Sequence, residues 1–397
     1  MRARPKGDSV SKAIAGEAAK TRLYVRTLRL TDFRNYARAE LKLDTRPVVL
    51  IGDNGSGKTN LLEAVSLLGA GTGLRSRPYA ELCRKDGAGG FAVAAKVVSR
   101  EDEVEIGTGV PAGSIEESKG RTVRIAGKEA SAGALSEHVK LVWLIPAMDG
   151  LFTGSASERR RFLDRLVLAV DVKMRSPQGR YDRAMRQRNR LFQMREGSRA
   201  LFEGLEEQMA EAGTAIAAAR LDAVARLAGL IERMREARGQ GPFPWAEIAL
   251  EGRLEEALSR LPATEVEDEF RALLAQGRER DRAAARALEG PHLSDFIVTH
   301  GPKNAPAAHC SSGEQKALLI GLILAKAELI KELEGAAPLI LLDEIAAHLD
   351  EARREALFAE ISSLGAQAWM TGTDRDLFAA IAENAQILAV NRGKIGA

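Results

Sequence analysis

The sequence predicts an α/β fold whose two parts flank an inserted, mostly α-helical second lobe. A glycine-rich loop at residues 52 to 59 follows an apolar run and precedes a helical pattern, which is the context of a phosphate-binding loop. A second apolar run, residues 338 to 342, ends in the carboxylates Asp343 and Glu344. Between these motifs, residues 157 to 288 are rich in Ala, Leu, Glu and Arg and poor in β-branched residues, which favours helices.

The remaining elements follow from local patterns along the chain. Residues 22 to 51 predict strands and end in the continuous apolar run expected of a buried central strand. A helical pattern begins at Asn60, and residues 91 to 130 predict short strands joined by glycine-rich turns. Two prolines within residues 239 to 245 must interrupt the helical insert. Strand-like patterns return at about Phe296.

Composition limits the classes of protein to which the chain can belong. Hydrophobic residues make up 45% and charged residues 28% of the chain, which is typical of a soluble globular protein. The longest strictly apolar run, residues 317 to 325, is too short to span a membrane. Cys83 and Cys310 show neither metal-ligand spacing nor a disulfide framework. We therefore expect a cytoplasmic protein without membrane partners.

The loop at residues 52 to 59 reads GDNGSGKT and matches the pattern G-x-x-x-x-G-K-[ST]. Its glycines allow the backbone to aim N–H groups at an anion, and the following helix adds its positive N-terminus. We expect Lys58 to act in catalysis by neutralising charge on the β- and γ-phosphates of ATP, and Thr59 to ligate Mg²⁺. The residues predicted to bind the nucleotide in this region are Gly52, Asp53, Asn54, Gly55, Ser56, Gly57, Lys58, Thr59 and Asn60.

The two carboxylates after residue 342 predict the hydrolytic half of the same site. Open α/β sheets place their chemistry at the carboxyl ends of strands. We expect Asp343 to hold Mg²⁺, directly or through water, and Glu344 to polarise the attacking water as the general base. Taken alone, an apolar strand ending in Asp-Glu usually runs into a solvated loop, so the prediction depends on the phosphate loop upstream.

Three later segments resemble motifs of the ABC ATPase superfamily. Residues 311 to 315, SSGEQ, resemble its signature sequence, and residues 347 to 350, AHLD, resemble its D-loop. Residues 369 to 374, WMTGTD, close a strand where the superfamily places its switch residue.

In that superfamily the signature of one subunit completes the ATP site of another. The resemblance implies that Ser312 and Gly313 contact the γ-phosphate bound by a second copy of the chain, and that Asp350 belongs to the same nucleotide site. The alternative for residues 311 to 314 is a plain N-capping turn.

The spacing of the motifs narrows the choice within the superfamily. The signature lies 255 residues after Lys58, farther than in transporter ATPases, and the insert shows no sustained heptad register. Seven stretches run along nearly the whole chain after residue 22: LTDFRNY (30–36), GDNGSGKTNLLEAVSLL (52–68), RRRFLDRL (159–166), YDRAMRQRNRLF (181–192), GPH (290–292), SSGEQKALLIGLILAKAEL (311–329) and LILLDEIAAHLDEARREALF (339–358). Together they resemble the RecF family of bacterial recombination mediators.

This resemblance implies a domain organisation and a function. We expect an ATPase head over residues 22–150 and 290–397 and a helical lobe over residues 151–289. The segment before them, residues 1–21, is basic and lacks the apolar centre of a signal peptide, so its own composition predicts a disordered tail. ATP and Mg²⁺ would favour a head-to-tail homodimer that binds gapped or duplex DNA through its backbone, with slow, DNA-stimulated hydrolysis acting as a timer. The implied task is to work with RecO and RecR at single-strand gaps and help load RecA in repair and the SOS response. The alternative function is an ATPase subunit of a transporter or another assembly without DNA.

One stretch favours the DNA-binding interpretation over that alternative. Residues 157 to 190 hold eleven lysines and arginines against four acids, a local net charge of +7, whereas the whole chain carries only +3. Concentrated positive charge suits contacts with phosphates, and the lack of interleaved aromatic residues disfavours base stacking. The alternative is a solvated helix face. We therefore assign DNA contact to the segment and not to single residues.

The sequence departs from the family pattern in three places. It has Pro146-Ala147-Met148-Asp149 where the family often shows Pro-Glu-Asp-Leu, and Leu293 where the family has arginine. No glutamine occurs before residue 178. The glutamine that usually links the γ-phosphate to the neighbouring lobe in ABC ATPases therefore has no evident counterpart.

Overall fold

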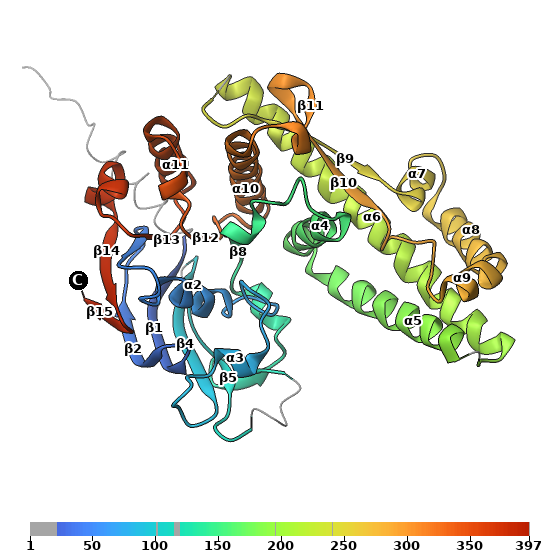
Figure 1. Cartoon of the computed structure of the whole chain (residues 1–397), viewed down its shortest axis with the longest axis horizontal. Coiled ribbons are helices and arrows are strands. Elements are labelled where there is room, and N and C mark those ends of the chain that lie inside the picture. The colour runs from blue at the N-terminus through green and yellow to red at the C-terminus, as the bar shows by residue number, and fades with distance from the viewer. Residues whose placement is uncertain (1–21, 101, 115–119, 195, 240, 397) are drawn as a thin grey trace, which may run out of the picture. The chain divides into compact units, whose positions relative to one another are not determined.

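The computed structural model describes residues 22–396 except 101, 115–119, 195 and 240. The basic tail expected over residues 1–21 lies outside the described residues. Contacts divide the chain into two compact units (Figure 1). The head unit contains the chain up to Met148 and from Lys326 onward, and the lobe unit contains Asp149–Ala325.

Two six-stranded sheets build the head unit. The first is antiparallel, with the strand order β2-β1-β4-β5-β6-β7. The second has the order β15-β14-β3-β13-β12-β8, and only β15 runs antiparallel to its neighbour. The strands are β1 (Leu23–Phe33), β2 (Tyr36–Lys42), β3 (Val48–Ile51), β4 (Phe91–Ser99), β5 (Asp102–Val110), β6 (Thr122–Ile125), β7 (Lys128–Ala130), β8 (Leu141–Leu144), β12 (Leu339–Leu342), β13 (Ala368–Gly372), β14 (Gln386–Asn391) and β15 (Lys394–Gly396). The strands predicted over residues 22–51 and 91–130 are present.

The apolar runs of the sequence form the centre of the parallel sheet. Val48, Val49 and Leu50 of β3 are fully buried, as are the side chains of β12 before Leu342. Strands buried on both faces read as continuous apolar runs. Because β13 pairs in parallel with both β3 and β12, the carboxyl ends of these strands lie at the same edge of the sheet.

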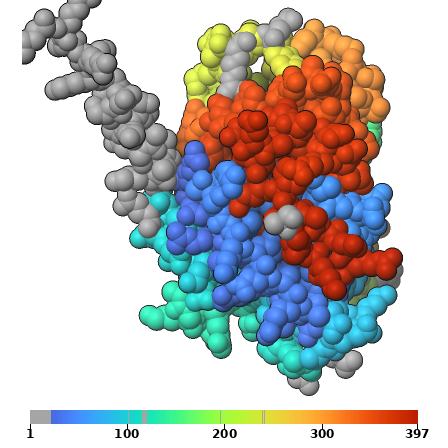
Figure 2. Space-filling view, turned by 90° about the vertical axis from the view of Figure 1, so that its left-hand side faces the viewer, coloured from blue at the N-terminus to red at the C-terminus, as the bar shows by residue number. Residues whose placement is uncertain are grey.

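Helices and the C-terminal strands complete the head unit. The helices are α2 (Lys58–Ser66), α3 (Tyr79–Leu82), α11 (Glu351–Leu364) and the last part of α10 (Ser312–Glu334). The strand β14, near the end of the chain, pairs with β3, near its beginning. Figure 2 accordingly shows the C-terminal segment in red beside the N-terminal strands in blue.

The lobe unit consists mainly of helices. Its helices are α4 (Ala156–Val170), α5 (Arg175–Met194), α6 (Arg199–Arg238), α7 (Arg253–Leu258), α8 (Ala263–Gln276), α9 (Arg278–Ala284) and the first part of α10. The long helices α5 and α6 lie side by side (Figure 1). A small antiparallel sheet has the order β11-β10-β9, formed by β9 (Ala246–Glu251), β10 (Asp295–His300) and β11 (Ala305–Pro306).

The second boundary of the insert differs from the expected one. The sequence analysis placed it at residues 289 and 290, whereas contacts assign the chain up to Ala325 to the lobe unit. The physical reason is the pairing of β10 with β9, which runs from Asp295 opposite Glu251 to His300 opposite Ala246. Because β9 lies within the insert, its partner β10, which follows the expected boundary, belongs to the lobe unit as well.

Candidate nucleotide-binding site

The phosphate loop leads directly from β3 into α2. Gly55 and Gly57 have φ angles of 79° and 117°, a region that favours glycine. A Cβ atom at Gly57 would lie 2.4 Å from Nδ2 of Asn35 and 2.7 Å from the hydroxyl of Tyr36. The glycine at this position therefore serves both the backbone conformation and the close packing of the loop.

Lys58 and Ser56 give the loop its polar lining. The Nζ atom of Lys58 donates hydrogen bonds to the carbonyl oxygens of Gly52, at 2.6 Å, and Asp53, at 2.9 Å. Burial lowers the pKa of Lys58, while the carboxylates at the end of β12 act in the opposite direction. The buried Oγ of Ser56 has no hydrogen-bond partner among the described residues. An ammonium group, an unused hydroxyl and a helix N-terminus together fit a phosphate group.

The predicted metal ligands meet at the end of the parallel sheet. The Oγ1 atom of Thr59 donates a hydrogen bond of 2.9 Å to Oδ1 of Asp343, although 284 positions separate these residues in the sequence. Asp343 is buried. Hydroxyl and carboxylate oxygens are the donors that Mg²⁺ prefers, so the pair fits this ion. The structure thus brings together the two residues predicted to ligate it.

Glu344, the predicted general base, has an unusual backbone conformation. Its φ angle is 56°, which non-glycine residues rarely adopt. The backbone N–H of Glu344 donates a hydrogen bond of 2.8 Å to Oγ1 of Thr371, and this hydroxyl donates one of 2.9 Å to Oδ1 of Asp343. Thr371 is buried at the end of β13 and therefore holds both carboxylate residues. The sequence analysis did not identify Thr371 as a site residue, although it included WMTGTD among the motifs.

Two further residues that the sequence analysis missed, Asn35 and Tyr36, support the phosphate loop from outside. Asn35 donates a hydrogen bond of 3.0 Å from Nδ2 to the carbonyl of Ser56, and accepts one of 2.8 Å from Asn60 at Oδ1. The buried hydroxyl of Tyr36 donates a hydrogen bond of 3.0 Å to the carbonyl of Gly57. Burial raises the pKa of Tyr36. Both lie within LTDFRNY, so the family motif was the available signal.

The signature segment forms a capped helix start in the lobe unit. The Ser311 N–H donates to Oε2 of Glu314 at 3.1 Å, and the Glu314 N–H donates to Oγ of Ser311 at 3.4 Å. This reciprocal pair is a capping box. The ion pair with Lys303, 2.6 Å long, is the main reason why the pKa of Glu314 falls to about 2. The capping alternative therefore describes residues 311 and 314, while Ser312 and Gly313 remain exposed in the first turn.

Asp350 also has a local structural role. Its Oδ1 atom accepts a hydrogen bond of 2.8 Å from the backbone N–H of Arg353, so the residue caps α11. The side chain remains exposed. A role of Asp350 in nucleotide binding stays a prediction, because the capping contact explains the residue type within a single chain.

The basic segment divides into buried and exposed residues. Arg159 forms an ion pair of 2.7 Å with Asp295, and Arg160 donates to the carbonyl of Ser294 at 2.8 Å. Burial lowers the pKa of Arg165 to about 10. These three arginines serve the interior of the lobe unit, so the net charge of the segment overstates its supply of free cations.

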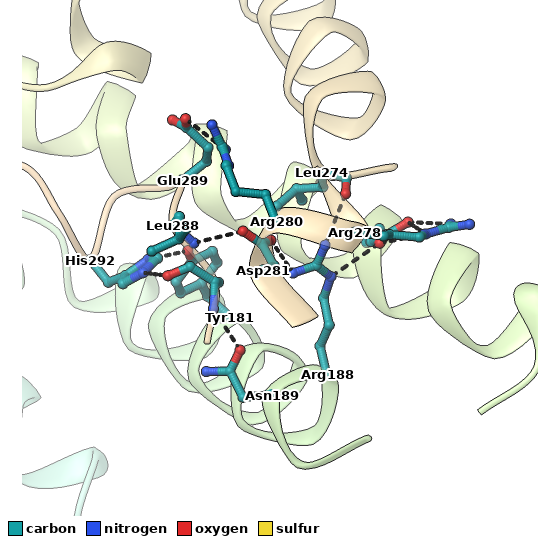
Figure 3. Close-up of polar contacts among 12 residues, drawn as sticks. Tyr181, Arg188, Asn189, Leu274, Arg278, Arg280, Asp281, Leu288, Glu289 and His292 are labelled. Atoms are coloured by element: carbon teal, nitrogen blue, oxygen red, sulfur yellow. Dashed lines mark hydrogen bonds and ion pairs between the residues drawn. The ribbon is translucent and has the colours of Figure 1, made fainter. Parts of the chain in front are cut away.

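Arg188 is the most deeply buried arginine of the basic segment. Its side chain is fully buried and forms ion pairs of 2.6 Å with Asp281 and 3.0 Å with Glu206. It also donates to the carbonyl of Leu274 at 2.8 Å (Figure 3). The close-up shows Tyr181 of the same helix contacting His292, at 2.7 Å between Oη and Nδ1.

Two features are absent from the described part of the chain. No group of three or more His, Cys, Asp or Glu residues in that part could hold a metal ion. Among the same residues, no helix combines the length and the apolar character needed to cross a membrane.

Comparison with known proteins adds independent information. The model of the "RecF/RecN/SMC N terminal domain" family matches residues 24–395. The chain is 53% identical to a protein of Mesorhizobium japonicum named "DNA replication and repair protein RecF", over 94% of this chain and 97% of the relative. A protein of the same name from Brucella suis is 51% identical, over 96% of this chain and 97% of the relative. These names do not favour the transporter alternative.

Solved structures confirm the predicted fold class. A structure described as "recombination mediator protein RecF-ATPrS in RecFOR pathway" superposes with a TM-score of 0.81 and 20% identity, covering 95% of this chain and 99% of the other. The corresponding "RecF-ATP" structure gives a TM-score of 0.79 at 21% identity, covering 94% and 99%. The chain thus has the fold of an ABC ATPase head, with mixed sheets and an inserted, mostly helical lobe.

Proposed function

The chain belongs to the RecF family, and on that premise we propose that it is an ATP-dependent DNA-binding protein of recombinational repair. It binds Mg-ATP, forms a head-to-tail homodimer and binds DNA at single-strand gaps. In the cytoplasm it works with RecO and RecR to help load RecA, in repair and in the SOS response. The observation that carries the proposal is the 2.9 Å contact between Thr59 of the phosphate loop and Asp343 of β12.

Each residue of the site has a separate task in this proposal. The loop N–H groups, the Ser56 hydroxyl and Lys58 bind the β- and γ-phosphates of ATP. Thr59 and Asp343 hold Mg²⁺, which when bound neutralises charge on the transferred phosphoryl group. The Glu344 carboxylate accepts a proton from the attacking water. Slow hydrolysis then sets how long the ATP-bound form lasts.

The exposed start of α10 supports dimerisation through ATP. Beyond the adjoining turn of its own helix, a Cβ atom added to Gly313 would meet no atom of the described residues within 4 Å, and Gly313 is not among the described glycines with positive φ. The lobe unit therefore does not itself require glycine at this position. Close approach of a second molecule explains the small residue, and we assign the Ser312 hydroxyl and the Gly313 N–H to the γ-phosphate held by the partner chain.

Replacement of Lys58 by methionine tests the nucleotide part of the proposal. Lys58→Met removes the charge that neutralises the phosphates, so the variant should lose ATP binding and ATP-dependent dimers. Nucleotide binding is measured by equilibrium dialysis and size by chromatography at two protein concentrations. Lys85→Met, which changes an exposed lysine of the same unit, is the matched control and should behave as the wild type.

Duplex DNA distinguishes the proposal from a transporter subunit. The wild type should bind a labelled duplex in the presence of Mg-ATP, and binding should weaken steeply with salt. The Lys58→Met variant should lose the ATP-dependent part of this binding. ATP-dependent dimers that persist in Lys58→Met would contradict the role of the phosphate loop, and a wild type without affinity for duplex DNA would contradict the proposed function.

A further inference from the structure

The helix α5 has two faces of different chemistry, and the inner one is fixed by buried contacts. Tyr181, Ala184, Arg188 and Phe192 are the buried residues of this helix. Their spacing of three, four and four residues places them on one face. Figure 3 shows Tyr181 and Arg188 of this face joined to residues from other segments of the lobe unit. Because these contacts fix the rotation of α5 within the lobe unit, they also fix the direction in which its opposite face points.

The outer face of α5 carries cations and no carboxylate directly opposite the buried side. Arg183, Arg186 and Arg190 are exposed and recur at intervals of three and four residues, so they line one face. Gln187 and Gln193 are also exposed beside this line. We call the three arginines and two glutamines the outer face of α5.

Within the described lobe unit, acidic side chains compensate little of the positive charge of this face. Among the described residues, neither Arg183 nor Arg190 has an ion pair within 4.0 Å. The charge of Arg186 acts on Asp182, one turn away, and lowers the pKa of that carboxyl group, although burial raises it more strongly. A line of arginines with so little internal compensation is suited to an external polyanion.

We propose that the outer face of α5 binds the phosphate backbone of duplex DNA. The inference rests on the proposed function and specifies which surface carries out its DNA-binding step. Arg183 and Arg190 are seven positions apart, which corresponds to about 10 Å along the helix. Duplex DNA carries one charge per about 1.7 Å of its axis. The line of arginines therefore faces several phosphates at once. The glutamine amides add donors of the kind that bind phosphate oxygens.

The chemistry of the face favours a duplex backbone over stacked single-stranded bases. The aromatic residues of α5, Tyr181 and Phe192, belong to the buried face. Stacking on aromatic side chains is the usual way of holding single-stranded bases. A face that offers only guanidinium and amide groups contacts phosphates, so its binding does not depend on the sequence of the DNA.

The test removes the three charges together and keeps the helix. The face variant is Arg183→Gln, Arg186→Gln, Arg190→Gln, since glutamine has nearly the helix propensity of arginine. The control variant is Arg199→Gln, Arg226→Gln, Arg271→Gln, which removes three exposed arginines of the same unit that already pair with neighbouring acids. Both variants lose the same net charge. Equal unfolding midpoints and equal ATP binding would show that both remain folded.

Binding of a labelled, blunt-ended duplex is measured for the full-length variants with Mg-ATP at several salt concentrations. The face variant should bind at least about tenfold more weakly than the wild type, and the slope of log K against log salt should fall by about 0.9 per arginine that contacts a phosphate. The control variant should retain both values. A smaller slope of log K against log salt in the face variant, but not in the control variant, supports direct contact between these arginines and phosphates.

Two negative outcomes are distinguishable. If the wild type binds duplex DNA while the face variant binds as tightly as the control, this inference is overturned and the face serves another partner, such as an acidic protein surface. If the wild type itself does not bind duplex DNA with Mg-ATP, the proposed function fails, and the inference fails with it.

Discussion

Thr371 connects the two carboxylate residues at the end of the parallel sheet. It accepts a hydrogen bond from the backbone of Glu344 and donates one to Asp343. A rare backbone conformation persists only where its surroundings hold it. We therefore regard Thr371 as a positioning residue, which acts through the carboxylate proposed to hold Mg²⁺ and through the proposed general base.

Replacement of Thr371 by valine tests this role. Thr371→Val keeps the size of the side chain but leaves the Glu344 N–H without its partner, so Glu344 loses its fixed orientation. We expect kcat for ATP hydrolysis to fall about ten- to hundredfold, as for other residues that orient metal ligands, with a much smaller change in ATP affinity. Thr371→Ser retains the hydroxyl and should restore most of the rate. Equal rates for the valine and serine variants would contradict the assignment.

The sequence was informative about single residues where a motif fixes the chemistry. The pattern at residues 52 to 59 predicted roles for Lys58 and Thr59, and the carboxyl end of an apolar run predicted one for Asp343; the structure brings Thr59 and Asp343 into contact. Thr371 was missed because its role depends on β13 lying between β3 and β12, an order that local patterns do not contain. Asn35 was missed for the same reason, since it reaches the phosphate loop from another sheet.

The helix α5 shows why the sequence of a basic segment does not reveal which of its arginines are exposed. Its residues 181 to 192 alternate between a buried face and an exposed face, and arginine occurs on both. Arg188 lies in the interior, where it pairs with acids of α6 and α9, whereas Arg190 is exposed two positions later. Only the partners of the helix decide which arginine is free, so charge counting could identify the segment but not its residues.

The stability of the lobe unit should respond to these two arginines very differently. Arg188→Ala leaves the buried carboxylates of Asp281 and Glu206 without this partner, and breaking a buried pair costs roughly 3–5 kcal/mol. Arg190→Ala changes an exposed residue and should alter the free energy of unfolding by less than about 0.5 kcal/mol. Chemical denaturation followed by circular dichroism measures both. A similar midpoint for the two variants would mean that the buried ion pairs contribute little.

The strand β9 shows a different limit of the sequence patterns. The prolines before residue 246 correctly indicated the end of a helix, but the strand that follows is only six residues long. Its partner β10 was assigned to the head because strand-like patterns there resembled a return to the α/β region. Antiparallel pairing between them is a non-local property, and it moves the boundary to Ala325.

For the whole molecule, the sequence predicted a split head around an inserted lobe, and the solved structures of similar fold confirm that class. The two motifs proposed to bind one nucleotide lie in different units, with the phosphate loop in the head unit and the signature in the lobe unit. Within one chain the signature has its own capping contacts and an exposed first turn. In the proposed dimer, a second copy of the chain therefore contributes Ser312 and Gly313 to the bound ATP.

Light scattering of Glu344→Gln with saturating Mg-ATP measures whether ATP holds two chains together. The substitution removes the proposed general base and preserves the shape of the side chain, so ATP should remain bound and hold two chains together. The predicted mass is that of a dimer with Mg-ATP and of single chains without nucleotide. Addition of Ser312→Arg to the same variant should spare ATP binding by each chain but prevent the dimer. Single chains of Glu344→Gln at saturating Mg-ATP would contradict the account.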